Sequence, residues 1–193
     1  MKLLFYFLLA FGFIACTNNK IDQNTESVDS TYITRGNALA KISFEALSGE
    51  LKRAIQNGGI EHALKYCNEN AYPLTDSLSQ ANHVSIKRVS NRYRNPGNKA
   101  DKMEEFLIKG FGNDLNEEKE ITPRLVLKED SVIFYKAIIT QPLCLTCHGQ
   151  PEKELAFSTD TLIRRLYPRD KAIGYEANQV RGLWRIGFKK ELR

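Results

Sequence analysis

The chain has 193 residues, of which 42% are hydrophobic, and a formal net charge of +5 from 28 Lys and Arg against 23 Asp and Glu. This length is typical of a single modest domain. The basic residues are scattered among acidic pairs such as Glu117-Glu118 and Glu129-Asp130. That pattern is typical of a solvated surface and gives no indication of a nucleic-acid partner.

The first fifteen residues have the pattern of a bacterial export signal. Met1-Lys2 is a short positive start, and Leu3 to Ile14 is a nearly unbroken apolar run. The run is shorter than the about 20 residues that a membrane-spanning helix needs, but it suits the apolar region of a signal peptide. It ends in Ala15-Cys16, which resembles a lipobox, although Phe13 stands where Leu is more usual. We predict a lipoprotein signal over 1–15, with lipid on Cys16. Cleavage after Ala15 without lipid is the alternative.

Residues 16–32 are mostly polar, and we predict that they form a flexible tether because such a composition cannot bury a core. The folded domain is then expected over 33–193. The sequence contains no second long apolar run, so we predict no transmembrane helix.

Helical spacing dominates the next fifty residues. Apolar residues from Ile33 to Ile55 recur on one helical face, and Gly58-Gly59 ends the pattern. A second helix is predicted from Ile60 to about Asn70, and Pro73 is expected to open a further helical turn.

The middle of the chain predicts strands. Residues 83–90 alternate, with Val84 and Ile86 on one face, as in a half-buried strand. Residues 94–98 predict a turn, 101–109 a helix with Met103, Phe106 and Leu107 on one side, and 110–122 a polar loop. Residues 124–127 and 132–139 are predicted to be strands of a hairpin.

Residues 144–148 read Cys-Leu-Thr-Cys-His, the attachment signature of c-type haem. Two thiols at this spacing can add across the two haem vinyl groups, and the adjacent imidazole can reach the iron. With four Cys and three His in the chain, a chance match is on the order of one in a thousand. The alternatives are a thioredoxin-like pair or half of a zinc site, and the zinc site lacks a second Cys pair. We therefore predict that Cys144, Cys147 and His148 bind one covalent haem c, which agrees with export.

After this motif, Ser158 to Asp160 are predicted to cap a helix that runs through Leu166, and residues 183–188 are predicted to form a last strand. Helices followed by antiparallel strands with helical excursions predict an α+β domain.

The other iron position has four candidate ligands, which are Cys67, His62, His83 and Met103. Cys67 belongs to an apolar stripe with Ile60, Ala63, Leu64 and Ala71, so it is expected to face the core. His62 lies about 140° away around that helix. The stripe leaves two interpretations of Cys67 open, an iron ligand and a small buried apolar residue.

Several further segments resemble one family. They are 63–68 with Ala71, 88–90, 94–98 with Asp101 and Glu104, 144–149, and Tyr167-Pro168, Asp170, Ala172, Gly174-Tyr175 and Arg181-Gly182. Over roughly 36–188 the chain resembles exported single-haem c-type domains with a PAS-like fold, which occur alone and as sensory parts of membrane histidine kinases and chemoreceptors. Ala100 stands where Pro is expected, and no kinase or methyl-accepting module is apparent.

The resemblance implies a PAS-like antiparallel sheet with N-terminal helices around one covalent haem. It also implies that His148 and the Cys67 thiolate hold the iron. A thiolate ligand should favour ferric iron and lower the reduction potential. Arg88, Arg92 and Arg94 could pair with haem propionates or form surface ion pairs, and the sequence leaves their roles open.

We expect a membrane-anchored monohaem cytochrome that transfers electrons in the cell envelope. It would lie on the periplasmic side, with the outer membrane favoured over the inner, and its redox partner is not identified. The alternative is a redox or gas (NO/CO) sensor module acting through a partner protein. An enzyme ranks last, because haem catalysis usually needs an open iron position and a distal acid–base group.

Overall fold

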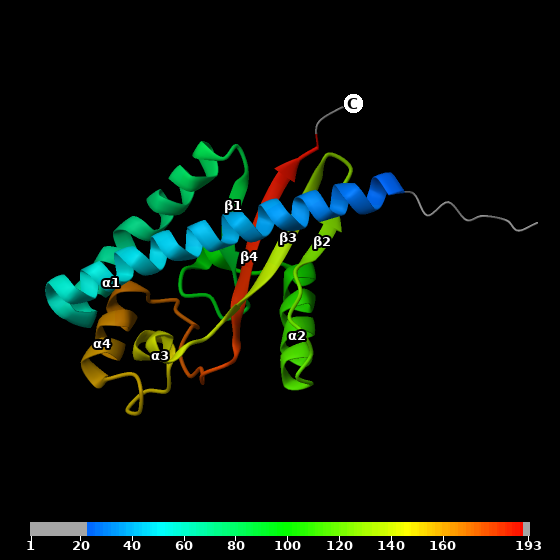
Figure 1. Cartoon of the computed structure of the whole chain (residues 1–193). Coiled ribbons are helices and arrows are strands. Elements are labelled where there is room, and N and C mark those ends of the chain that lie inside the picture. The colour runs from blue at the N-terminus through cyan, green and yellow to red at the C-terminus, as the bar shows by residue number, and fades with distance from the viewer. Residues whose placement is uncertain (1–22, 191–193) are drawn as a thin grey trace, which may run out of the picture.

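The computed structural model describes residues 23–190 (Figure 1). The predicted signal over 1–15 and Cys16 lie outside the described residues, as does the first part of the predicted tether. Residues 23–32 are described, and they are helical where the composition predicted a tether. The reason is an aromatic contact that a composition argument cannot see. The Tyr32 ring packs against Phe188 with ring centroids 5.3 Å apart.

The first helix, α1 (Gln23–Ala81), is interrupted where the sequence predicts a stop. Gly58 and Gly59 have non-helical backbone, with φ of −167° and 74°. The positive φ at Gly59 suits glycine because it has no Cβ. The chain reverses at this break, so α1 consists of two helical halves that diverge from it like a hairpin (Figure 1).

The second half of α1 is longer than predicted, because it continues through Pro73 to Ala81. Proline removes one helical hydrogen bond. Beyond the proline, Thr75 Oγ1 donates to Ala71 O (2.7 Å) and Ser79 Oγ donates to Thr75 O (2.9 Å). Thr75 is also buried, so tertiary packing holds this part of the helix.

Four antiparallel strands form one sheet in the order β1-β4-β3-β2. Their bounds are β1 (Ser85–Val89), β2 (Arg124–Leu127), β3 (Ser131–Ile139) and β4 (Val180–Lys189). These bounds agree with the predicted strands within a few residues. The two central strands, β3 and β4, are buried on both faces. An antiparallel sheet with helices packed on it is an α+β fold, as predicted.

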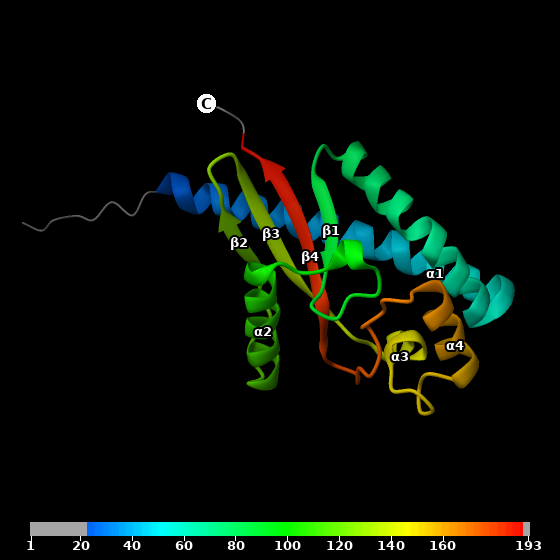
Figure 2. The same cartoon turned by 180° about the vertical axis from the view of Figure 1, so that it is seen from behind.

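Each face of the sheet has its own cover. The first half of α1 crosses one face, where Leu39 and Ala40 pack against Phe134 and Ile186 (Figure 1). The helix α2 (Lys102–Asn116) packs on the opposite face of the sheet, which the view from behind shows (Figure 2). There Phe111 packs with Ile133, Tyr135 and Leu183.

The helix α2 differs from its prediction in length and orientation. It runs through Gly110 and Gly112 to Asn116, where a polar loop was expected. Met103 and Phe106, predicted on the packed side, are 51% and 70% exposed. The buried face is Glu104, Leu107, Ile108 and Phe111.

Glu104 can take a buried position because its carboxylate has partners. It pairs with Arg185 (3.3 Å), accepts from the Tyr135 hydroxyl (3.4 Å) and closes a capping box with Asp101. A buried charge is tolerated only with such partners. Burial, followed by the charge of Glu104, raises the pKa of Tyr135 to about 12.

Three short elements lie at one end of the sheet: η1 (Pro96–Asn98), α3 (Pro142–His148) and α4 (Phe157–Leu166). α4 packs on the second half of α1 through Leu64, Leu162 and Ile163. Its N-cap is Ala156, so the predicted cap at Ser158–Asp160 is wrong and those residues lie inside the helix. None of the helices within residues 23–190 is long and apolar enough to cross a membrane.

Gly36 in α1 allows the helix to lie directly on the sheet, and this gives a stability prediction. A Cβ at Gly36 would lie 2.3 Å from Phe134 Cδ2, and Phe134 is fully buried. We expect Gly36→Ala to lower the free energy of unfolding by about 1–3 kcal/mol through overpacking. The control is Gly49→Ala in the same helix, where a Cβ would meet nothing within 4 Å. That change should be neutral or raise the free energy of unfolding by about 0.5–1 kcal/mol. Urea unfolding followed by circular dichroism measures both, and an unchanged midpoint for Gly36→Ala would contradict the packing described.

Candidate functional site

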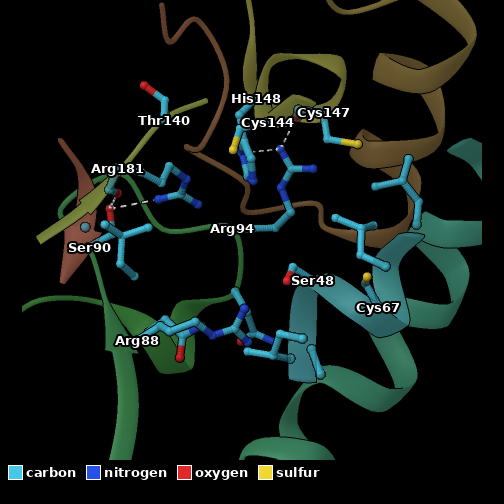
Figure 3. Close-up of a pocket in the computed structure, with 18 of the residues that line it drawn as sticks. Ser48, Cys67, Arg88, Ser90, Arg94, Thr140, Cys144, Cys147, His148 and Arg181 are labelled. Atoms are coloured by element: carbon cyan, nitrogen blue, oxygen red, sulfur yellow. Dashed lines mark hydrogen bonds between the residues drawn. The ribbon is translucent and has the colours of Figure 1, made fainter. Parts of the chain in front are cut away.

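A cavity of about 310 Å³ lies where α1, the sheet and α3 meet (Figure 3). This volume is at the lower end of the about 300–1,000 Å³ found for ligand pockets. Both halves of α1 supply an apolar wall, formed by Phe44, Leu47, Leu51, Ile55, Ile60 and Leu64. The polar part of the lining contains three arginines, Arg88, Arg94 and Arg181, and no Asp or Glu among the described residues. The cavity is therefore apolar on one side and cationic on the other.

The helix α3 brings the predicted motif residues to this cavity. Cys144, Cys147 and His148 all line it. Pro142 at the first turn suits a helix start. Gly149 ends the helix by donating to Leu145 O (2.7 Å), and a Cβ at Gly149 would lie only 2.6 Å from that oxygen. The glycine after the motif histidine is therefore needed for the close approach.

The His148 ring is fixed by a backbone carbonyl. Its Nδ1 lies 2.6 Å from Ala172 O. A carbonyl oxygen can only accept, so Nδ1 carries the proton and Nε2 keeps its lone pair. This tautomer is assigned from the hydrogen bond. Burial, followed by the charges of Arg181 and Arg94, lowers the pKa of His148 well below its ordinary value. The imidazole is thus neutral, with Nε2 able to bind a metal.

The segment that carries Ala172 wraps around the end of α3. Tyr175 N donates to His148 O and Gly174 N donates to Gly149 O, each at 2.8 Å. Gly174 has a φ of 74°, a conformation that favours glycine. The Tyr175 ring meets the His148 ring edge-on, with centroids 6.4 Å apart. Residues far from the motif in sequence therefore position its histidine.

Arg94 ties this segment to α3. It donates to Cys147 O (2.6 Å) and Ala172 O (3.3 Å), and its Nε donates to Asp170 Oδ1 (3.2 Å). Arg94 Nη2 also lies 3.2 Å from His148 Nδ1. Since Nδ1 already donates to Ala172 O, two donors face each other there, and this contact is a close approach without a hydrogen bond.

Cys67 lines the same cavity from the second half of α1. Figure 3 shows it on a different side of the cavity from His148. Ala63 and Leu64 are buried, which confirms that the predicted apolar stripe faces the core. The Cys67 thiol is half-buried, and this burial, followed by the nearby Cys147, raises its pKa. A metal or another cation would be needed to hold it as a thiolate.

The other candidates for the second iron position do not reach the cavity. His62 and His83 are exposed, and Met103 is 51% exposed on α2. None of the three is part of the lining. Of the four candidates, only Cys67 shares the cavity with His148.

Arg88 and Arg181 also line the cavity; the sequence left the role of Arg88 open and assigned none to Arg181. Burial lowers the pKa of both, and that of Arg181 falls to about 10. Arg88 lies on β1 and Arg181 lies on β4, so the alternation of residues along each strand indicates which face of the sheet carries the side chain. Nothing in that pattern shows that this end of the sheet opens into a cavity.

The described donor set does not fit a zinc site. Within residues 23–190, no three His, Cys, Asp or Glu cluster in a way that could hold a metal ion. The three cysteines of that range are free thiols, so Cys144 and Cys147 do not form a thioredoxin-like disulfide here.

A known protein shares this architecture. The crystal structure of the cyanobacterial heme-protein Tll0287 matches with a TM-score of 0.58 and 20% sequence identity, over 81% of this chain and 98% of that chain. At this identity the likeness shows a shared fold. No curated protein matches the chain. The family model described as Tll0287-like (Tll0287) matches residues 15–188, which include the whole cavity lining. The chain therefore belongs to the Tll0287-like family.

Proposed function

We propose that this protein is a monohaem c-type cytochrome domain. The observation that carries the proposal is that Cys144, Cys147 and His148 share one cavity, whose other walls are apolar and cationic. A porphyrin with two carboxylates has the complementary chemistry, apolar faces and an anionic edge. The match to a protein described as a heme-protein supports the same cofactor.

The two motif thiols would hold the cofactor covalently. Each S–H adds across a vinyl C=C bond, so a thioether forms and nothing leaves. Cys144 and Cys147 lie one helical turn apart on α3, so both can face the same ring edge. Burial raises the pKa of the Cys147 thiol, so in the folded protein without haem this thiol is protonated.

His148 and Cys67 are the proposed axial ligands. His148 offers Nε2 because Nδ1 donates to Ala172 O, the arrangement that usually orients a metal-binding histidine. Cys67 Sγ lines the cavity from α1. When bound, the haem supplies one-electron redox chemistry, and a thiolate ligand biases it toward the ferric state.

Electron transfer fits this site better than catalysis. With Cys67 bound, the iron has no open position. Among the described lining residues, no carboxylate and no histidine other than His148 could act as a distal acid–base group. We propose that the protein is not an enzyme.

The location that we propose comes from the N-terminal sequence. The export signal over 1–15 and lipid on Cys16 would anchor the domain at the periplasmic side of the envelope, with the outer membrane favoured. The membrane contact and a protein redox partner are the expected interactions, with no nucleic acid. The PAS-like description of the fold stays a prediction from the resemblance.

One observation favours the alternative of a redox or gas sensor. Cys67 lies on the half of α1 that follows the non-helical Gly58-Gly59 break. Release of this ligand could free that half-helix to move, which would turn ligand exchange into a conformational signal.

The first prediction from the proposed function concerns attachment. Wild-type protein, matured in a host with haem-loading machinery, should give a c-type pyridine haemochrome and carry the mass of one haem. The Cys144→Ala/Cys147→Ala variant should lose the covalent haem, whereas Cys67→Ala should keep it. Colourless wild-type protein with both motif thiols open to alkylation would overturn the proposed function.

The second prediction concerns the Cys67 ligand. Cys67→Ala should alter the ferric absorption spectrum and raise the reduction potential, because an anionic donor is lost. His62→Ala, an exposed residue five positions earlier on the same helix, is the matched control and should keep the wild-type spectrum and potential. Identical spectra for Cys67→Ala and wild type would reject thiolate ligation.

The third prediction separates a carrier from a sensor. A carrier should remain six-coordinate in both redox states, and its ferrous form should resist carbon monoxide. Resonance Raman spectra report the coordination, and hydrogen exchange of residues 60–81 reports the mobility of the second half of α1. Ligand loss on reduction together with faster exchange over 60–81 would favour the sensor and reject the carrier.

A further inference from the structure

Four arginines gather near the cavity, and their partners divide them into different roles. They are Arg88, Arg92, Arg94 and Arg181. The sequence allowed propionate contacts or surface ion pairs for three of them. What distinguishes them in the structure is how many of their N–H donors already have an acceptor within the protein.

Arg94 uses Nε and Nη2 to donate within the protein, and its Nη1 has no acceptor among the described residues. Asp170, Cys147 O and Ala172 O accept from it, and Asp170 is itself held by Ala172 N (3.0 Å). Its charge is paired with that of Asp170, and both side chains are nearly buried, at 12% and 7% exposed. Arg94 is therefore a positioning residue for the acceptor of His148, and its charge already has the carboxylate of Asp170 as a partner.

Arg92 is outside the cavity lining. It donates to Ile173 O and stacks on the Tyr175 ring, 3.9 Å from the ring centroid. It therefore packs the segment that carries Ala172 from the far side.

Arg88 and Arg181 also line the cavity, but within residues 23–190 neither forms an ion pair with a carboxylate, unlike Arg94. The Arg88 guanidinium has no hydrogen-bond or ion-pair partner within residues 23–190. Arg181 uses Nη1 to donate to Ser90 Oγ (3.0 Å) and Arg92 O (2.9 Å). Its Nε is buried and has no partner among the described residues. A guanidinium carries five N–H donors, so most donors of this pair are unused.

Two desolvated cations without an anion are costly to bury. No carboxylate in the described lining neutralises them. In the view of Figure 3, Arg88 lies across the cavity from both Cys144 and Cys147, and Arg181 lies away from Cys147, between Arg88 and Cys144. The vinyl-linked edge of a bound haem would lie at Cys144 and Cys147, and the propionates project from the opposite edge of a porphyrin.

We propose that Arg88 and Arg181 form a carboxylate subsite that binds the two haem propionates. This inference rests on the proposed function and assigns a role within the same cavity. Guanidinium groups suit this task because they bind carboxylates through two parallel N–H donors. The two positive charges would match the two negative charges of the propionates and leave the Cys67 thiolate paired with the iron.

The test compares charge-matched variants of the holoprotein. Arg88→Gln and Arg181→Gln should shift the propionate bending bands in resonance Raman spectra and lower the reduction potential. Lys87→Gln removes the same charge from the exposed residue next to Arg88 on β1, outside the cavity lining, and should leave these bands as in wild type. Unshifted bands in both Arg88→Gln and Arg181→Gln would overturn the subsite.

Two further measurements test the subsite if Arg88→Gln or Arg181→Gln fails to mature. Arg88→Lys and Arg181→Lys keep the charge but lose the planar donor pair, so a band shift in them supports the subsite and its absence overturns it. A crystal structure of wild-type holoprotein decides without any variant. Propionate oxygens within hydrogen-bond distance of both arginines support the proposal, and propionates elsewhere, with or without a solvent anion at the arginines, overturn it. Wild-type protein that carries no covalent haem would instead overturn the proposed function. The pyridine haemochrome detects that failure, so it is distinguished from a failure of the carboxylate subsite.

Discussion

The site depends on one hydrogen bond, from His148 Nδ1 to the carbonyl oxygen of Ala172. It fixes the tautomer, turns the ring and leaves Nε2 as the free donor atom. The bond exists because the segment from Asp170 to Tyr175 folds back on α3. Two backbone hydrogen bonds, the turn at Gly174 and the Arg94–Asp170 pair hold it there. Without these contacts, a histidine at the end of a seven-residue helix would be free to rotate.

A second constraint is the charge distribution of the cavity. The described lining brings together three arginines and no carboxylate, beside two cysteines whose pKa values are raised by burial. Buried cations are poorly satisfied without an anion, and a buried thiol becomes a thiolate only beside a cation. An iron porphyrin would supply what both need, a cation for sulfur and anions for the guanidinium groups. The same arginines, lying near the iron, would oppose the tendency of a thiolate to lower the potential.

Local patterns in the sequence predicted most of the fold. Alternation located the strands, helical spacing located both halves of α1, and Gly58-Gly59 marked the break between them. The motif residues were predicted from their spacing, and the apolar stripe predicted that Cys67 faces the core. The role of Cys67 as an iron ligand came from the family resemblance and stays a prediction. The errors arose where distant residues decide the outcome. Glu104 is buried in place of Met103 because Arg185 and Tyr135 partner it, and residues 23–32 are helical because Tyr32 meets Phe188. Ala172 could not be found as a support, because its role belongs to a backbone oxygen and leaves no mark on the side chain.

The two proposed iron ligands come from distant parts of the chain, and this has a consequence for biogenesis. Cys144, Cys147 and His148 are nearly contiguous, so maturation machinery can read them on a nascent, extended polypeptide. Cys67 reaches the cavity only after both halves of α1 have docked on the sheet and α4. Covalent loading and thiolate capture are thus separable in time, and the second event reports that the domain has folded. Under the proposed ligation, the iron then acts as a crosslink between residues 67 and 148, which opposes unfolding by restricting the disordered chain.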